Sequence, residues 1–446
     1  MAQRRFKKKD LLNMISALEK ANTLMGGKGG SAMPDRADTL IQCQKAALVI
    51  GDYLETQGES IQRIVKVLEN YCENIYQLSL AAGDDNRCSK IAKKIRQQLL
   101  TIKTAVREEL PEDKKEIVFL PYKASMWDSL ESLWKKAAAD ESCETFVIPI
   151  PYFDKNPDGS LGRMHYEGEQ YPEEVPVTSW REYDMAARRP DVIYIHNPYD
   201  ECNLVTSIHP DFYAKEIKEY TDMLVYVPYF ICINDVVQEE FCILPGTIWA
   251  NQIILQSEAV REKYIEIFHR WEDSQGCRDA FGKAEEKFVA LGSPKFDKVI
   301  SAKREDYVLP EEWRRLIERE DGSRRKVVLY NTTLGAMLRD TEEMLAKIRN
   351  VFEVFRNQKE VVLLWRPHPL LRETLCSMRS RTVLEYDEIV ERYRKEAWGI
   401  YDDTADMYQA ITVSDAYYGD NSSVVELYKR TGKPIMIQNV KVSLEP

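Results

Sequence analysis

The sequence predicts an α/β protein in which two Rossmann-like domains face a cleft and an all-helical region precedes them. Apolar residues recur at helical spacing as far as about residue 110. Beyond that point short apolar runs alternate with amphipathic segments, a pattern typical of parallel sheets. Several of these runs end directly in polar residues. We expect a helical region over 1–111, a first Rossmann-like domain over 112–240 and a second over 241–446.

Composition limits the class of protein. The chain has 446 residues, 30% of them charged, with a net charge of −11. This acidic balance argues against nonspecific nucleic-acid binding. The absence of a run of ~20 apolar residues, and of a signal-peptide core, predicts a cytoplasmic protein. The nine cysteines include no C-x-x-C pair, so we expect reduced thiols and no zinc site. Five basic residues open the chain and are either a solvated end or a contact for anionic lipid at the inner membrane face: Arg4, Arg5, Lys7, Lys8 and Lys9.

The helical region shows its period most clearly at Leu11, Ile15 and Leu18. The glycine-rich stretch 26–31 lacks the spacing of a P-loop and follows a helix, so we reject a phosphate-loop interpretation. A helical unit of this kind serves homo-oligomerisation, docks a partner, or packs as an extra layer on the catalytic body. The sequence leaves these alternatives open.

The first domain is predicted from strands near 116–121, 145–151, 189–196 and 223–233, with helices near 127–139 and 211–220. A polar insertion over 153–180 is placed to cover a cleft. For the second domain we expect strands near 247–255, 288–291, 326–330, 361–365, 416–419 and 434–438, with helices between them.

Two strand exits in the second domain carry the chemistry. The strand 416–419 ends in four polar residues before a helix, namely Asp420, Asn421, Ser422 and Ser423. Hydroxyls and free N–H groups at such a junction suit an anion, most naturally a phosphate; the alternative is that these residues only cap the helix. After the strand 361–365, Arg366 and His368 face the same predicted crevice. A third strand, 326–330, ends in Asn331, Thr332 and Thr333, which either contact a ligand or form a plain strand-to-helix turn.

Three of these segments resemble the CDP-glycerol glycerophosphotransferase family, the teichoic-acid-type polymerases. Gly292, Ser293 and Pro294 open the run GSPKFD, which is similar to the family's G-x-P-R-x-D. RPHP at 366–369 is similar to R-x-H-P, and DNSS at 420–423 to D-Y-S-S. The resemblance covers about residues 245–440. It implies a GT-B arrangement and transfer of glycerol phosphate or a related polyol phosphate from a CDP-activated donor to a hydroxyl of a glycan or lipid-linked acceptor, with release of CMP.

The resemblance also implies roles for the residues. His368, Arg366, Ser422 and Ser423 would stabilise charge on the diphosphate. Where the family carries H-G-T-P-L-K, this chain has Pro228-Tyr229-Phe230 and no histidine. We therefore expect His209, or less favourably His196, to take the acceptor's proton. We assign no metal ligands, because we interpret Asp402 and Asp403 as a turn, and the sequence leaves the metal requirement open. The alternatives are a GT-B glycosyltransferase that uses a nucleotide sugar and a noncatalytic nucleotide-binding protein.

Overall fold

A computed structural model describes residues 7–26, 36–55, 62–81, 83–379, 381–404 and 406–438. The chain forms two compact units. One contains Met1–Lys115 and Asp184–Arg189, and the other contains Glu116–Tyr183 and Pro190–Pro446. The glycine-rich stretch 27–31 and the basic residues Arg4 and Arg5, on which two interpretations depended, lie outside the described residues. In the part of the chain that is described, no helix combines the length and apolarity needed to cross a membrane.

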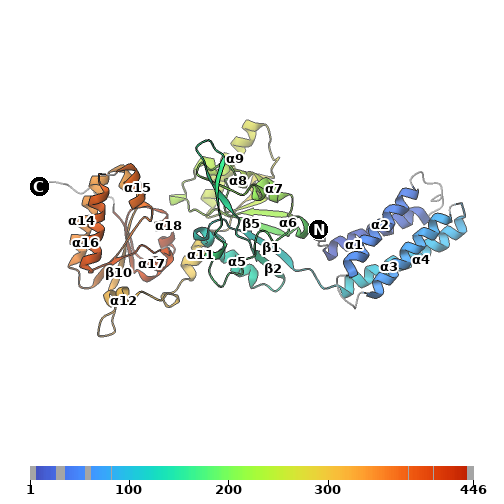
Figure 1. Cartoon of the computed structure of the whole chain (residues 1–446), viewed down its shortest axis with the longest axis horizontal. Coiled ribbons are helices and arrows are strands. Elements are labelled where there is room, and N and C mark those ends of the chain that lie inside the picture. The colour runs from blue at the N-terminus through green and yellow to red at the C-terminus, as the bar shows by residue number, and fades with distance from the viewer. Residues whose placement is uncertain are drawn as a thin grey trace. The chain divides into compact units, whose positions relative to one another are not determined.

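The first unit contains four long helices, which Figure 1 shows running side by side. Leu11, Ile50, Leu68 and Leu99 are among the residues of its continuous apolar core, at the spacing that the sequence predicts. The helical N-terminal region is thereby confirmed. Its helices are α1 (Lys8–Gly26), α2 (Arg36–Glu55), α3 (Gln62–Leu80) and α4 (Asp85–Glu109), with the short α6 (Met185–Arg188) assigned to the same unit.

The second unit begins with a six-stranded sheet in the order β2-β1-β5-β7-β8-β9. Strands β1, β5, β7, β8 and β9 are parallel to their neighbours in that series. The strands are β1 (Lys115–Leu120), β2 (Cys143–Val147), β5 (Val192–Ile195), β7 (Met223–Tyr226), β8 (Gln252–Leu255) and β9 (Phe288–Ala290). The helices are α5 (Glu131–Ala138), α7 (Ala214–Lys218), α8 (Pro245–Trp249), α9 (Glu258–Gln275), α10 (Ala284–Lys287) and α11 (Pro294–Ser301).

This sheet corrects one prediction. We expected the strands near 247–255 and 288–291 to belong to the second sheet, but β8 and β9 are the last two strands of the first. The segment 245–249 is the helix α8, which begins at Pro245, so β8 is shorter than expected. Sheet membership depends on long-range pairing, and the alternating pattern is the same in both sheets.

The polar insertion builds a small antiparallel sheet in the order β4-β3-β6. Its strands are β3 (Tyr152–Lys155), β4 (Leu161–His165) and β6 (Thr206–Ile208). Tyr152 lies opposite His165 on one side and Ile208 on the other. The first part of the insertion therefore pairs with the later strand β6 in one ordered sheet, with β3 at its centre.

The second sheet has five strands in the order β12-β11-β10-β13-β14, and all its pairs are parallel. Tyr330 and Trp365 point to the face covered by α14, α15 and α16, and Leu329 and Leu364 to the face covered by α12, α17 and α18. The strands are β10 (Lys326–Thr332), β11 (Val361–Pro367), β12 (Ile400–Tyr401), β13 (Ala416–Gly419) and β14 (Ile435–Ile437). The helices are α12 (Glu311–Ile317), α13 (Leu334–Arg339), α14 (Thr341–Arg356), α15 (Leu371–Met378), α16 (Val383–Glu396), α17 (Met407–Val413) and α18 (Ser423–Lys429). The predicted fold class, two parallel α/β sheets after a helical region, is confirmed.

Candidate functional site

The carboxyl ends of β10, β11 and β13 lie at one edge of the second sheet. Asn331 is in register with Arg366 on one side and with Gly419 on the other. The residues that follow each strand therefore emerge together at this edge, where ligands bind in open α/β sheets. Since neighbouring strands are ~4.8 Å apart, residues that leave β11 and β13 start about 10 Å from one another.

Asn331 joins the three strand ends. Its amide nitrogen Nδ2 donates to the backbone oxygen of Arg366 over 3.0 Å, and its Oδ1 accepts from the Ser422 hydroxyl over 3.2 Å. Gly419 makes the approach feasible, because a Cβ at that position would meet the backbone oxygen of Asn331 at 2.4 Å. The Asn331 side chain is buried and engaged at both ends. It organises the edge and does not extend from it.

Asp420 is also buried and orients its neighbours. Its Oδ2 accepts from the backbone N–H of Thr333 over 2.8 Å and from the Thr333 hydroxyl over 3.1 Å. The ammonium of Lys347 reaches Oδ1 over 3.1 Å. Thr332 is fully buried, and its hydroxyl accepts from the indole of Trp365. The turn after β10 is thus held by internal contacts of its side chains.

Ser422 stands at the N-cap position of α18 but makes no side-chain cap, because its hydroxyl donates to Asn331 instead. Helix capping, the alternative interpretation, therefore does not describe this residue. Asn421 and Ser423 are exposed. Since α18 has only seven residues, its dipole alone does not make an anion site. Asn421 and Ser423 are therefore the residues of this run whose side chains are exposed, and Ser423 offers a hydroxyl.

His368 follows β11 and is half-buried. Its backbone N–H donates to the oxygen of Thr332 over 2.9 Å, and its Nδ1 accepts from the backbone N–H of Leu370 over 3.2 Å. Burial lowers the pKa of His368 below 6.5. The imidazole is therefore neutral at pH 7, with the remaining proton on Nε2. This arrangement suits donation of a hydrogen bond to a phosphate oxygen.

Arg366 differs from the expectation that it is free for phosphate. Its guanidinium is buried, forms an ion pair with Asp402, and donates to the backbone oxygen of Thr404 over 2.8 Å. Asp402, which we interpreted as a turn residue, is the buried partner of this arginine. The pair fixes the segment after β12 against β11. Arg366 therefore stabilises the backbone at this edge of the sheet. Its guanidinium is engaged with Asp402 and Thr404 and does not point toward a ligand site as a bidentate donor.

The run that begins at Gly292 lies at the exit of β9, in the first sheet. Gly292 has a φ of 93°, and the hydroxyl of Ser293 accepts from the N–H of Lys295 at the start of α11. Pro294 is the first residue of that helix and is buried. The ammonium of Lys295 lies 2.5 Å from a carboxylate oxygen of Asp128, with both side chains about one-tenth exposed. In this structure the run builds a helix entry and a buried ion pair.

His196 is a correction. It is completely buried: its Nε2 accepts from the backbone N–H of Tyr122 over 3.0 Å, and its Nδ1 lies 2.9 Å from the hydroxyl of Ser129. Desolvation lowers the pKa of His196 to about 4. Both ring nitrogens are occupied and water is excluded. The residue is built into the first sheet and is not placed to accept a substrate proton.

His209 follows β6 and packs among Phe153, Trp180 and Phe212. Its Nδ1 accepts from the backbone N–H of Asp211 over 3.3 Å. Because Phe153 is next to Tyr152 on β3, the ring of His209 lies on the opposite face of the small sheet from Tyr152. The Tyr152 side is the one that reaches the carboxyl end of β1, where its ring lies 5.5 Å from that of Tyr122.

The sequence analysis missed a histidine on that side. The Nε2 of His165 is 2.7 Å from a carboxylate oxygen of Asp154, and its ring stacks on Tyr152 at 5.1 Å. The ammonium of Lys123 lies 5.1 Å from the centre of the same tyrosine ring. A signal was present, because the turn sequence NPDGS at 156–160 predicts a hairpin that brings β3 and β4 together.

Two tyrosines follow strands of the first sheet, Tyr199 after β5 and Tyr229 after β7. The hydroxyl of Tyr229, after β7, lies 3.0 Å from that of Tyr199. Burial raises the pKa of Tyr199 above its ordinary value. Tyr199 is therefore neutral at pH 7 and can donate a hydrogen bond, but a neutral phenol is a poor proton acceptor.

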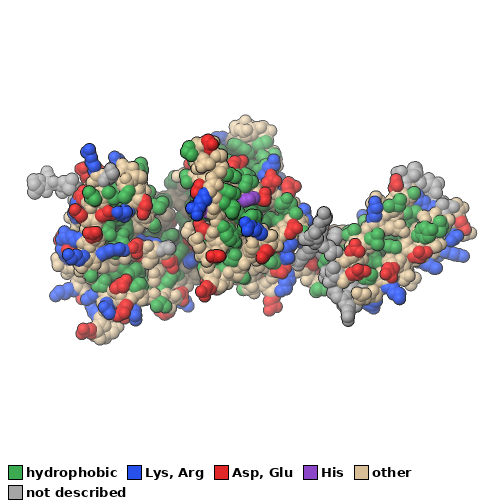
Figure 2. All heavy atoms as spheres, in the orientation of Figure 1, with side chains coloured by type: hydrophobic (Ala, Val, Ile, Leu, Met, Phe, Trp, Pro, Cys, Tyr) green, Lys and Arg blue, Asp and Glu red, His purple; other side chains and the backbone are tan. Residues whose placement is uncertain are grey.

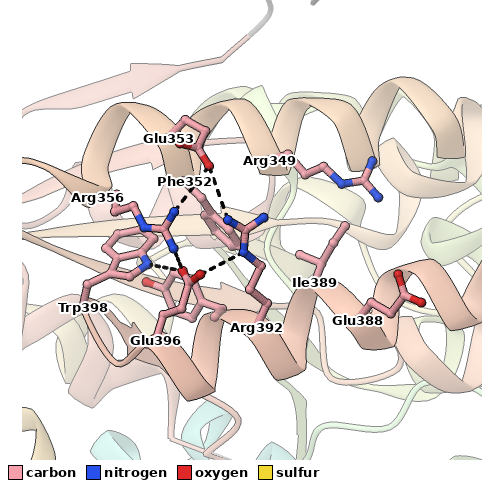
Figure 3. A pocket seen from close by; sticks show the side chains of 10 residues that line it. Arg349, Phe352, Glu353, Arg356, Glu388, Ile389, Arg392, Glu396 and Trp398 are labelled. Atoms are coloured by element: carbon pink, nitrogen blue, oxygen red, sulfur yellow. Dashed lines mark hydrogen bonds and ion pairs between the residues drawn. The ribbon is translucent and has the colours of Figure 1, made fainter.

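Figure 3 shows a separate pocket of about 130 Å³ between α14 and α16. Arg356 forms ion pairs with Glu353 and Glu396, and Arg392 contacts the same two carboxylates. The pocket lies where these helices end, before β11 and β12, so it is at the amino-terminal edge of the sheet. Its charges neutralise one another, and it lies away from the strand exits. Among the described residues, no group of three or more His, Cys, Asp and Glu side chains is placed to hold a metal ion.

Comparison with protein families identifies the part of the chain that carries this edge. Residues 261–442 match the family CDP-Glycerol:Poly(glycerophosphate) glycerophosphotransferase. The resemblance to the glycerophosphotransferase family is thereby confirmed over these residues. They include α11, the whole second sheet and the exits that bear His368 and Ser423. None of the curated proteins matches the chain significantly.

Solved structures are similar at low identity. A variant of the wall teichoic acid polymerase TagF with CDPG shares 14% identity, covers 83% of this chain and 78% of its own, and gives a TM-score of 0.40. UDP-GlcNAc 2-epimerase from Methanocaldococcus jannaschii shares 8%, with coverage of 74% and 85% and a TM-score of 0.41. The enzyme from Neisseria meningitidis bound to UDP-GlcNAc shares 9%, with coverage of 74% and 84% and a TM-score of 0.41.

Proposed function

We propose that the protein transfers glycerol phosphate or a related polyol phosphate from a CDP-activated donor to a hydroxyl of a cell-envelope glycan or lipid-linked acceptor, releasing CMP. The observation that carries the proposal is the match of residues 261–442 to the glycerophosphotransferase family, together with a half-buried His368 whose Nε2 proton is available at the matched edge. The reaction breaks the bond between the two phosphorus-bearing groups, so charge grows on the leaving CMP phosphate.

On the donor side, His368 donates from Nε2 to a phosphate oxygen, and the hydroxyl of Ser423 donates to another. Asn331, Asp420 and Ser422 hold the two donors in place through the contacts described above. Hydrogen-bond donors that are fixed in place and aimed at the developing charge stabilise the transition state more than mobile donors do, because fixed donors need no reorganisation during the reaction. This division assigns direct contact to the accessible residues and positioning to the buried ones.

On the acceptor side, we assign the proton acceptor to His165 with Asp154 as its orienting carboxylate. A histidine held by a carboxylate over 2.7 Å is a common general base. It shares the face of Tyr152 and the carboxyl end of β1, whereas His209 points to the other face of the small sheet. His209 remains the alternative. A lipid-linked acceptor would place the enzyme at the inner membrane face, where the exposed Lys9 is suited to anionic lipid. Lys8 is not suited to that role, because it is buried and its ammonium is bound to Glu112 and the backbone oxygen of Leu110.

A nucleotide-sugar glycosyltransferase and a noncatalytic nucleotide-binding protein are the alternative functions. The first would use the same phosphate donors but move a sugar without phosphorus. The second would explain why the family's histidine run is absent. The products distinguish them, since only the proposed reaction releases CMP while phosphorus appears in the acceptor.

The first experiment is a calorimetric titration with CMP, CDP-glycerol, UDP and UDP-glucose. We expect cytidine-selective binding that weakens at least about tenfold in His368→Ala and in Ser423→Ala. His269→Ala is the matched control, because that histidine lies on α9 beside Glu285. Binding of uridine nucleotides in preference would favour the glycosyltransferase. No nucleotide binding by the wild-type protein would refute the proposal.

The second experiment follows turnover with CDP-glycerol labelled in the glycerol phosphate and a hydroxyl acceptor. His165→Gln is expected to lower kcat at least about a hundredfold with little change in donor affinity. Asp154→Asn should lower kcat less. Normal turnover in His165→Gln together with loss in His209→Gln would transfer the role to His209. CMP binding without turnover under any condition would support the noncatalytic alternative.

A further inference from the structure

The helical unit carries an exposed apolar groove between α2 and α3. The groove has a volume of about 520 Å³, and its apolar lining includes Ala47, Leu48, Leu68 and Tyr76. Leu48 is 59% exposed and Tyr76 is 51% exposed. Figure 2 shows apolar side chains at the surface over this part of the unit. An apolar surface of this kind on a small helical unit indicates a binding site.

Gly51 lies on the wall of the groove, one turn after Ala47 in α2. A Cβ at this position would meet no atom within 4 Å, so packing within the unit does not require glycine. Glycine inside a helix costs about 1 kcal/mol relative to alanine. The missing side chain leaves room for another backbone to come close to α2.

Four exposed carboxylates line the groove alongside its apolar residues: Asp52, Glu55, Glu69 and Glu73. Within the described ranges, no lysine or arginine forms an ion pair with any of them. An apolar groove lined by exposed carboxylates selects an apolar helix face flanked by positive charge.

The exposed face of α4 has that character. Lys90, Lys93, Lys94 and Leu100 are exposed and recur at helical spacing, and Leu100 is 59% exposed. The distance between a charged residue and an apolar residue along the helix is also the same on the two surfaces. Lys93 precedes Leu100 by seven residues, as Glu69 precedes Tyr76, which is two helical turns or about 10 Å in each case.

We propose that α4 of one copy docks into the α2/α3 groove of a second copy, so that the protein associates with itself through its helical unit. Leu100 packs against Leu48 and Tyr76, and Lys93 and Lys94 face Glu69 and Glu73. Each copy offers both surfaces. When two copies exchange α4 reciprocally, the pair has two-fold symmetry and closes as a dimer.

Charge reversal of both surfaces tests the pairing. Sedimentation velocity and light scattering of the full chain should show a dimer at tens of micromolar concentration, weaker at high salt. Glu69→Lys/Glu73→Lys alone and Lys93→Glu/Lys94→Glu alone should each weaken dimerisation at least about tenfold. All four changes in one chain should restore it. Reversal of Lys9 and Lys20, two exposed lysines of α1, is the matched control and should have no such effect.

Zero-length crosslinking of carboxylates to lysines supplies an independent readout. In a mixture of ¹⁴N- and ¹⁵N-labelled chains, crosslinks that join α3 to α4 should include pairs with one peptide of each label, which cannot form within a single chain. A monomeric wild type, or a dimer indifferent to both reversals, would overturn the proposal. If the wild type is monomeric but binds a basic amphipathic peptide, the groove belongs to another partner and the proposal of self-association fails.

Discussion

His196 offers a sharp test, because its surroundings predict how it titrates. In the folded protein its pKa is lowered to about 4, whereas an unfolded histidine titrates near 6.5. Between these values the unfolded chain binds a proton that the folded chain does not. The contribution of His196 to the free energy of unfolding is therefore complete above pH 6.5 and is lost as the pH falls toward 4. A difference of about 2.5 pKa units corresponds to about 3 kcal/mol.

The assay is a histidine-selective ¹³C NMR titration, in which the chain's five histidines give five signals. His196→Gln assigns its signal by loss, and His269→Gln does the same for a histidine that is partly exposed. We expect the His196 signal to stay in its neutral position down to about pH 5, well below the ordinary histidine pKa of about 6.5. In parallel, the difference in the free energy of unfolding between the wild type and His196→Gln should be about 3 kcal/mol smaller at pH 4 than at pH 7. A His196 signal that titrates near 6.5 would refute the burial argument and would return this residue to the candidates for general base.

Three further predictions concern packing. Gly419→Ala forces a Cβ against the backbone of β10, so it should destabilise the protein by about 3 kcal/mol in urea unfolding and abolish CMP binding; unchanged binding would contradict the close approach. Lys295→Met leaves the buried carboxylate of Asp128 without its cation and should lower the free energy of unfolding by about 3–5 kcal/mol. Lys298→Met removes a more exposed ion pair and should lower the free energy of unfolding by less than about 1 kcal/mol. Lys287→Met removes an ammonium that donates to three backbone oxygens and should lower stability by about 3 kcal/mol; a neutral substitution would show that water replaces it.

Local pattern was sufficient for most elements of the fold. Helical periodicity gave the helical character of the first unit, and the apolar runs that end in polar residues gave the three strand exits of the candidate edge. Assignment of β8 and β9 to a sheet failed because it depends on which strands pair across the fold, and every βα unit has the same local pattern. The hairpin of β3 and β4 was overlooked inside a polar insertion, and His165 with it.

Site residues were harder to predict than elements, because a side chain's role depends on partners distant in sequence. Arg366 has the composition of a phosphate ligand, but Asp402, 36 residues later, occupies its guanidinium. His196 follows a strand as a catalytic histidine often does, yet Tyr122 and Ser129 close over both its nitrogens. His196 does follow its strand, β5, whereas Arg366 lies within β11, which is longer than predicted. The contacts that decide what each group can do are tertiary.

The motif residues at the second sheet's edge fall into two groups with different physical duties. Asn331, Asp420 and Ser422 are buried and bond to one another's strands, which fixes the spacing between the exits of β10, β11 and β13. His368 and Ser423 retain accessible donors. A diphosphate needs donors at fixed separation more than it needs many donors, because mobile donors lose entropy when they bind. We therefore infer that the buried group sets the geometry and that the accessible pair makes the contacts. Loss of a buried member should disturb stability and affinity together, whereas loss of His368 should affect affinity alone.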